Sequence, residues 1–127
     1  MTLLILVVDD EPDARQMLAT LLEACKSEVR AAASGYEALD LLAVWHPDVI
    51  VSDVGMPEMD GFSFIEQLRQ RAAAAGGRIP AVALTAHARV EHRARALHAG
   101  FNSHVPKPVD PVELFAVIAS LRPRRDA

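Results

Sequence analysis

The sequence predicts an α/β domain in which a five-stranded parallel sheet is covered by helices on both faces. Short apolar runs alternate five times with segments of helical period along the 127 residues. The strand-like runs are continuous, which is typical of strands buried on both faces. A chain of this length suits one domain and can bury roughly 65–70% of its unfolded surface.

The first two strand–helix units cover residues 3 to 46. Residues 3–8 (LLILVV) predict a buried strand, and the Glu-Pro-Asp at 11–13 opens a helix because proline is tolerated in a first turn. This helix is expected to bury one apolar face: Ala14, Met17, Leu18, Leu21, Leu22 and Cys25. Residues 28–31 predict the second strand. A second helix begins at 34 or 35 and ends before Pro47.

The other three units follow the same rule. Further strands are expected at residues 48–52, 80–84 and 103–105. The helices between and after them are expected to bury Phe62, Ile65, Leu68 and Ala72, then Val90, Ala94 and Leu97, then Leu114, Val117, Ile118 and Leu121. Arg89, Arg93 and Arg95 make the fourth helix basic, which is typical of a solvated face, with a surface for a partner as the alternative. We expect one domain over residues 1–121 and a frayed tail at 122–127.

Composition excludes several classes of protein. The net charge of −4 argues against a nucleic-acid binder, and the single cysteine excludes a disulfide framework. The longest apolar runs are far shorter than the ~20 residues of a membrane span, and no signal peptide is recognisable. A cytoplasmic domain with no membrane contact of its own is expected.

Polar side chains follow four of the predicted strands. Asp9 and Asp10 come after the first, Asp53 after the third, Thr85 after the fourth and Lys107 after the fifth. In parallel sheets these carboxyl ends share one edge, where ligands bind. We therefore expect three carboxylates, a hydroxyl and an amine to converge.

The convergence of these groups has a chemical meaning. Carboxylates this close repel one another unless a cation lies among them, and hard oxygen ligands favour Mg²⁺, with Mn²⁺ as a substitute. Zinc would need histidine or cysteine, and only His87 and His104 are near these strand ends. A carboxylate can also act as a nucleophile toward phosphorus. Lys107 is then suited to neutralise phosphoryl oxygens and Thr85 to donate a hydrogen bond to one.

Four motifs at these strand ends resemble the receiver domain of bacterial response regulators, the phosphoacceptor domain of two-component systems. They are Asp9-Asp10-Glu11-Pro12, Ser52-Asp53-Val54-Gly55-Met56-Pro57, Leu84-Thr85-Ala86 and Val105-Pro106-Lys107-Pro108. The motifs occur in order, and the resemblance covers essentially the whole chain. It is strongest to the receivers of hybrid histidine kinases. It implies a doubly wound, flavodoxin-like fold with strand order 2-1-3-4-5.

The resemblance also implies roles for individual residues. Asp53 would accept a phosphoryl group from the phosphohistidine of a kinase or phosphotransfer protein, and Thr85 and Lys107 would contact that group. Asp10, Asp53 and the backbone carbonyl of Gly55 would bind Mg²⁺, with Asp9 acting through water. The peptide bond between Lys107 and Pro108 would be cis.

The same resemblance implies a signalling module that catalyses only its own phosphorylation and dephosphorylation. Phosphorylation would switch the face made by the fourth helix, fifth strand and fifth helix. The parent is either a stand-alone receiver, as a monomer or weak dimer, or the C-terminal receiver of a hybrid kinase. The kinase, the input signal, the output partner and the phosphate lifetime are not specified by the sequence.

Three positions depart from the common family pattern. His104 stands where receivers often carry an aromatic switch residue, which would couple to Thr85. Gly55 and His87 occupy the two positions that tune the lifetime of the aspartyl phosphate.

Other functions fit the residues less well. A flavodoxin-like cofactor binder needs a phosphate-cradling loop after the first strand, where Asp9 and Asp10 would repel phosphate. A haloacid-dehalogenase-type phosphatase needs a second aspartate at the position of Gly55. A phosphate-independent pseudo-receiver, acting as an interaction domain, is the alternative function.

Overall fold

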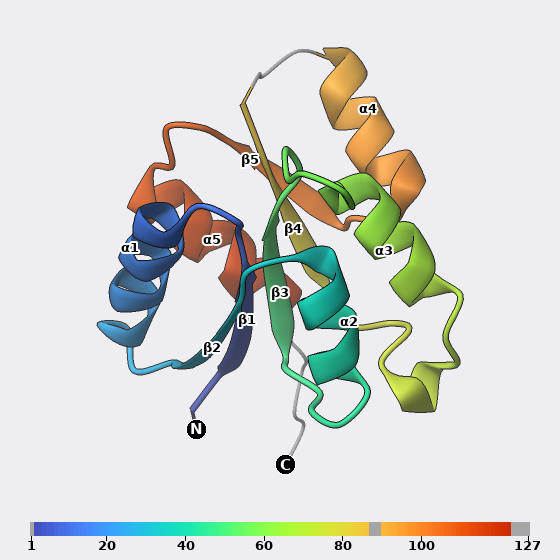
Figure 1. The fold of residues 1–127 in the computed structure, drawn as a ribbon. Coiled ribbons are helices and arrows are strands. Elements are labelled where there is room, and N and C mark those ends of the chain that lie inside the picture. Colours follow the sequence, from blue (N-terminus) through green and yellow to red (C-terminus); the bar gives the residue numbers. More distant parts are fainter. Residues whose placement is uncertain (1, 87–89, 123–127) are drawn as a thin grey trace.

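The computed structural model describes residues 2–86 and 90–122 of the chain. Its sheet has five parallel strands in the order β2-β1-β3-β4-β5, which confirms the predicted fold class and strand order (Figure 1). The strands are β1 (Leu4–Val8), β2 (Glu28–Ala32), β3 (Val49–Asp53), β4 (Ala81–Thr85) and β5 (Ser103–Pro106).

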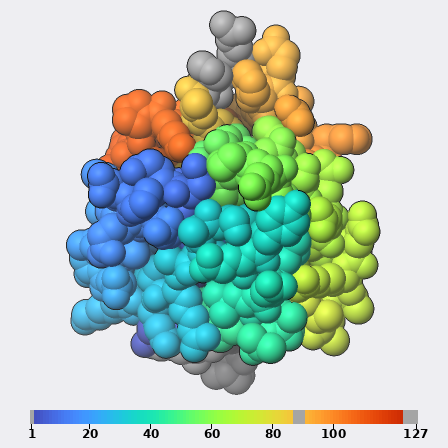
Figure 2. Space-filling view, viewed as in Figure 1, coloured from blue at the N-terminus to red at the C-terminus, as the bar shows by residue number. Residues whose placement is uncertain are grey.

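Helices cover both faces of this sheet, with α1 and α5 on one face and α2, α3 and α4 on the other (Figure 1). They are α1 (Pro12–Glu23), α2 (Gly35–Leu42), α3 (Gly61–Arg69), α4 (Val90–Ala99) and α5 (Pro111–Leu121), with a short 3₁₀ helix, η1 (Ala73–Ala75), after α3. In the space-filling view α1, α2 and α3 hide most of the sheet (Figure 2). None of the helices in residues 2–86 and 90–122 is long and apolar enough to cross a membrane.

Four helices begin at a capping side chain. The cap accepts a hydrogen bond from a backbone N–H of the first turn, which satisfies a donor that the helix itself cannot. The capping residues are Glu11, Ser34, Asp60 and Asp110. In α1 and α5 proline follows the cap directly, as its fixed φ and missing N–H favour.

The core has two layers because successive strand residues point to opposite faces. Leu6, Val8 and Ile50 pack toward α2 and α3, whereas Ile5 and Val7 pack toward α1 and α5. Both faces of β1, β3 and β4 are therefore buried, which explains their continuous apolar sequences.

The structure corrects three details of the predicted helices. Met17 is 71% exposed, and Cys25 is exposed beyond the end of α1, so neither packs on the inner face. In α4 the buried residue is Ala96, while Ala94 and Leu97 are exposed. Apolar residues occupy more of α1 than one face needs, and the alanines of α4 give little contrast between faces.

The third helix is also shorter than predicted. The apolar spacing predicts helix as far as Ala72, but α3 ends at Arg69 and Ala72 instead precedes η1. Arg69 is therefore the last residue of α3, and its side chain makes contacts that are described below.

Candidate functional site

Three carboxylates meet at the carboxyl edge of the sheet. Asp9 and Asp10 follow β1, and Asp53 is the last residue of the neighbouring strand β3. One carboxylate oxygen from each lies within 4.8 Å of the others. Asp9 and Asp53 are almost fully buried, at 1% and 6% exposure, so their mutual repulsion is poorly screened by water. The predicted convergence of the acidic residues is present.

Asp9 is the most deeply buried member of this cluster. Its Oδ1 accepts a hydrogen bond from the Glu11 backbone N–H at 3.0 Å, and its buried Oδ2 has no hydrogen-bond partner among the described residues. Burial raises the pKa of Asp9, the Glu11 N–H lowers it, and the Asp53 carboxylate raises it again, with a net increase. A cation beside Oδ2 would offset both the cost of burying the Asp9 charge and the repulsion from the Asp53 carboxylate.

Lys107 brings a positive charge to the cluster from the loop after β5. Its Nζ lies 2.8 Å from Asp53 Oδ1, and the same oxygen accepts a hydrogen bond from the Gly55 backbone N–H at 3.3 Å. The Lys107 backbone N–H donates to the Thr85 carbonyl at 2.7 Å, and the Lys107–Pro108 peptide bond is cis. The hydrogen bond to Thr85 holds the backbone of Lys107 beside β4 while its amine reaches the Asp53 carboxylate.

Thr85 ends β4, the strand between Asp53 and Lys107. It is 1% exposed, and its Oγ1 has no hydrogen-bond partner within residues 2–86 and 90–122. His104 of β5 is half-buried and pairs with Ala83 of the neighbouring strand β4. No hydrogen bond joins His104 to the Thr85 hydroxyl. His87 lies outside the described residues. The structure thus brings Asp9, Asp10, Asp53, Thr85 and Lys107 to one edge of the sheet, and the coupling of Thr85 to His104 stays a prediction.

Gly61 is a site residue that the sequence interpretation missed. Its N–H donates to the Val54 carbonyl at 3.0 Å, which closes the loop between β3 and α3. A Cβ at Gly61 would lie 2.4 Å from the Asp53 carbonyl oxygen and 2.7 Å from Val54 Cα. The first turn of α3 is therefore pressed against the backbone of Asp53. A glycine directly after the capping Asp60 was the available signal.

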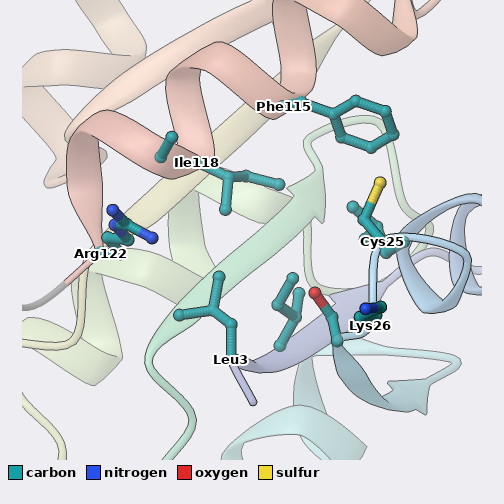
Figure 3. A pocket seen from close by; sticks show the side chains of 10 residues that line it. Leu3, Cys25, Lys26, Phe115, Ile118 and Arg122 are labelled. Carbon is teal, nitrogen blue, oxygen red and sulfur yellow. The ribbon is translucent and has the colours of Figure 1, made fainter. Parts of the chain in front are cut away.

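A hollow lies at the other end of the sheet, away from the carboxylates. It has a volume of about 390 Å³ and is bounded by the start of β1, the turn after α1 and the helix α5 (Figure 3). Leu3 and Ile118 line its apolar part, while Cys25, Lys26 and Arg122 contribute polar groups. Asp9, Asp10, Asp53, Thr85 and Lys107 do not line this hollow, so it is separate from the acidic cluster.

Comparison with other sequences agrees with this geometry. The family model of the response regulator receiver domain matches residues 5–119. An uncharacterized 14.6 kDa protein of Leptolyngbya boryana is 49% identical over 90% of this chain and 86% of its own length. The sensor histidine kinase RcsC of Escherichia coli is 38% identical over 84% of this chain, which spans only 11% of RcsC.

Solved structures of other proteins share this fold. A putative response regulator from Chloroflexus aurantiacus superimposes with a TM-score of 0.89 at 31% identity, covering 95% of this chain and 98% of that one. The receiver domain of the sensor histidine kinase PA1611 from Pseudomonas aeruginosa, described with a magnesium ion coordinated in its active-site cleft, gives 0.85 at 29% identity, covering 95% and 98%.

An acidic cluster, a lysine and a threonine at the carboxyl edge of a 2-1-3-4-5 sheet define a class of signalling domain. The chain belongs to the response regulator receiver domain family. Receiver domains are signalling modules of two-component systems and not metabolic enzymes.

Proposed function

We propose that Asp53 accepts a phosphoryl group from a phosphohistidine on a histidine kinase or histidine phosphotransfer domain. One observation carries the proposal. The acidic cluster, the Lys107 ammonium and the unpartnered Thr85 hydroxyl occupy one edge of the sheet. A nucleophile, a site for a divalent cation and two donors for phosphoryl oxygens are the parts that phosphoryl transfer requires.

The acidic cluster also fits a magnesium ion. Carboxylate oxygens, backbone carbonyls and waters are its preferred ligands, and the unpartnered Oδ2 of Asp9 is a buried acceptor in need of a donor or cation. Asp10, Asp53 and the Gly55 carbonyl would hold the ion, with Asp9 acting through water, and Mn²⁺ could substitute. Bound magnesium would neutralise the carboxylates and the incoming phosphoryl oxygens. The magnesium described for the PA1611 receiver supports this assignment.

The residues of this chain perform the transfer as follows. A carboxylate oxygen of Asp53 attacks phosphorus while the bond to the donor imidazole breaks, and the electron pair of that bond stays on the imidazole nitrogen. The Lys107 ammonium leaves its direct contact with Asp53 to donate to a phosphoryl oxygen, and Thr85 donates to another. Both groups are already held at the edge, so little ordering is needed during the reaction.

Phosphorylation then biases the face formed by α4, β5 and α5. Thr85 and His104 are the proposed coupled pair, and Gly55 and His87 the residues that tune phosphate lifetime. We expect a cytoplasmic domain that acts as a monomer or weak dimer, either alone or as the C-terminal receiver of a hybrid kinase. Its output partner is unknown, and no contact of this domain with nucleic acid or membrane is expected.

Intact mass measurement with acetyl phosphate and Mg²⁺ tests the phosphoacceptor. The expected result is a single phosphoryl adduct that is absent without Mg²⁺ and absent from Asp53→Ala. Beryllofluoride binding, measured in parallel, detects a competent site even when hydrolysis is too fast for the adduct to accumulate. A folded protein that forms no adduct and binds no beryllofluoride would instead be a phosphate-independent interaction domain.

A further inference from the structure

Arg95 of α4 contacts two residues at the start of α3. Its guanidinium carbon lies 4.1 Å from the centre of the Phe62 ring, a cation–π distance. Its NH2 lies 4.0 Å from Asp60 Oδ2. The other oxygen of Asp60 accepts the capping hydrogen bond from the Ser63 N–H at 2.8 Å. Arg95, Asp60 and Phe62 are here called the α3–α4 clasp.

The α3 side of the clasp is joined rigidly to the phosphoacceptor. Gly61 lies between Asp60 and Phe62, and it has no room for a Cβ against the backbone of Asp53 and Val54. The Gly61 N–H also donates to the Val54 carbonyl at 3.0 Å. A backbone shift at Asp53 therefore has to move the first turn of α3, and with it both partners of Arg95.

The α4 side of the clasp has little apolar packing within the described residues. Within the described part of α4, Ala96 is the one fully buried residue, and Leu97 is 48% exposed. The helix forms a projecting edge of the molecule (Figures 1 and 2). At its C-terminal end, Arg69 Nε donates to the Gly100 carbonyl at 2.9 Å. One end of α4 is thus anchored, while a small apolar contact, the Arg95 side chain and an interaction of the half-buried His92 hold the middle.

We propose that the α3–α4 clasp is the contact through which the phosphoacceptor loop controls the position of α4. This rests on the proposed function of Asp53. The clasp is made in a conformation where Lys107 contacts Asp53 directly, at 2.8 Å. In this proposal the clasp breaks when Lys107 turns to a phosphoryl group, so weakening the clasp favours that second conformation. Arg95 is a positioning residue, because it acts through α3 and touches neither phosphoryl group nor metal.

The size of the effect follows from the exposure of the clasp. The side chains of Arg95 and Asp60 are 62% and 37% exposed, so solvent weakens their attraction, and the contact to Phe62 adds a modest amount. Contacts of this kind shift a two-state equilibrium by about fivefold. By linkage, the affinity for a ligand of the second conformation rises by at most the same factor.

Beryllofluoride affinity, measured by titration with Mg²⁺ present, tests the clasp without depending on phosphate lifetime. Arg95→Gln removes the cation, and Asp60→Asn removes the anion while keeping a good helix cap. Arg95→Gln is expected to bind about fivefold more tightly than the unmodified chain. Asp60→Asn is expected to bind more tightly by a smaller factor, because the contact of Arg95 with Phe62 remains, and the double variant no more tightly than Arg95→Gln. Arg93→Gln, at an exposed arginine of the same helix, should bind normally. Urea unfolding checks that every variant is folded.

The outcomes separate the two proposals. Normal or weaker beryllofluoride binding by folded Arg95→Gln would overturn the clasp and leave the proposed function of Asp53 intact. Additive effects of Arg95→Gln and Asp60→Asn would show that the residues act separately, which also overturns it. A folded, unmodified chain that neither binds beryllofluoride nor forms a phosphoryl adduct would overturn the proposed function and the clasp together.

Discussion

Lys107 Nζ and Asp53 Oδ1, 2.8 Å apart, form an ion pair that spans the end of β4. The aspartate ends β3 and the lysine follows β5, so the buried hydroxyl of Thr85 lies on the strand between them. The pair is asymmetric in exposure, with the lysine side chain 35% exposed and the aspartate 8%. Lys107 is thus the more accessible partner and is placed to change its contact.

Replacing Lys107 should separate metal binding from phosphorylation. In Lys107→Ala, Mg²⁺ no longer competes with an ammonium group for Asp53, so its affinity should be unchanged or a few-fold higher. Phosphorylation by acetyl phosphate should slow by about 10–100-fold, because the phosphoryl oxygens lose a donor. Calorimetry and intact mass measure the two effects. The other lysine, Lys26, lies at the far hollow, and Lys26→Ala should change neither. If Lys107→Ala lost both Mg²⁺ affinity and phosphorylation, the role of Lys107 as a donor to the phosphoryl group would be contradicted.

Removing the charge of Asp9 should stabilise the protein while weakening its metal site. Burial raises the pKa of this carboxyl, so its ionised form is less favourable in the folded protein than in the unfolded chain. Asp9→Asn should therefore increase the free energy of unfolding at pH 7, by on the order of 1 kcal/mol, and reduce Mg²⁺ affinity.

The pH dependence of this gain has a defined sign. A carboxyl with a raised pKa stabilises the fold when protonated, and that contribution is lost as pH rises through the folded-state pKa. The advantage of Asp9→Asn should then be greatest at neutral pH and shrink on acidification, as measured by urea unfolding without metal. A variant less stable than the unmodified chain at pH 7 would show that the hydrogen bond to Glu11 outweighs the burial.

Gly61 offers a test of close packing behind the phosphoacceptor. A Cβ there would lie 2.4 Å from the Asp53 carbonyl oxygen, so Gly61→Ala should cost about 2 kcal/mol of stability. Gly55→Ala is the matched control, since the nearest atom to its Cβ would be Asp53 Oδ1 at 4.0 Å. Chemical denaturation compares them. Equal stability of the two variants would mean that the loop yields at little cost.

The sequence predicted the features that depend on neighbouring residues. Continuous apolar runs located the strands, and the position after each strand located Asp9, Asp53, Thr85 and Lys107. The carboxyl ends of parallel strands lie at one edge of the sheet however the helices pack. This is why the convergence of these side chains could be predicted without coordinates.

The features that depend on pairing between distant segments were not predictable. Arg95 is exposed, as expected for a solvated face, but its contacts with Asp60 and Phe62 at the start of α3 were not predicted. Arg69 of α3 binds backbone 31 residues further along the chain, and no local pattern indicates that partner. The prediction of which side of α4 is buried was also wrong, because alanines give little difference in hydrophobicity around a helix.

Arg69 is expected to be the most important polar side chain for stability. Its guanidinium donates to the carbonyls of Gly100, Gly77 and Ile79 and to the side chain of Asn102. Burial lowers its pKa, as expected for a charge held away from water. Arg69→Met leaves these acceptors without their donor and should cost about 3 kcal/mol.

The control for this substitution is the exposed Arg78, whose charge also lowers the pKa of Arg69 by repulsion. Arg78→Met should be neutral or slightly stabilising in the same denaturation experiment. If Arg69→Met and Arg78→Met were equally stable, the hydrogen bonds of Arg69 would contribute no more than those that water supplies to its acceptors.

Thr85 should show a conflict between stability and function. Its buried hydroxyl has no partner among the described residues, so the fold bears the cost of removing it from water. Thr85→Val keeps the shape of the side chain and removes that cost, so the unfolding midpoint should stay the same or rise. The same variant lacks the donor proposed for a phosphoryl oxygen, and its beryllofluoride affinity should fall about tenfold.

Ser52 provides the comparison for Thr85. It is also fully buried, but its hydroxyl donates to the Asp53 carbonyl at 2.9 Å. Ser52→Ala should therefore lose stability, by about 1 kcal/mol, where Thr85→Val does not. A marked loss of stability in Thr85→Val would reveal a structural partner for its hydroxyl. Retention of stability together with loss of beryllofluoride binding would mean that the buried donor is kept for the phosphoryl group.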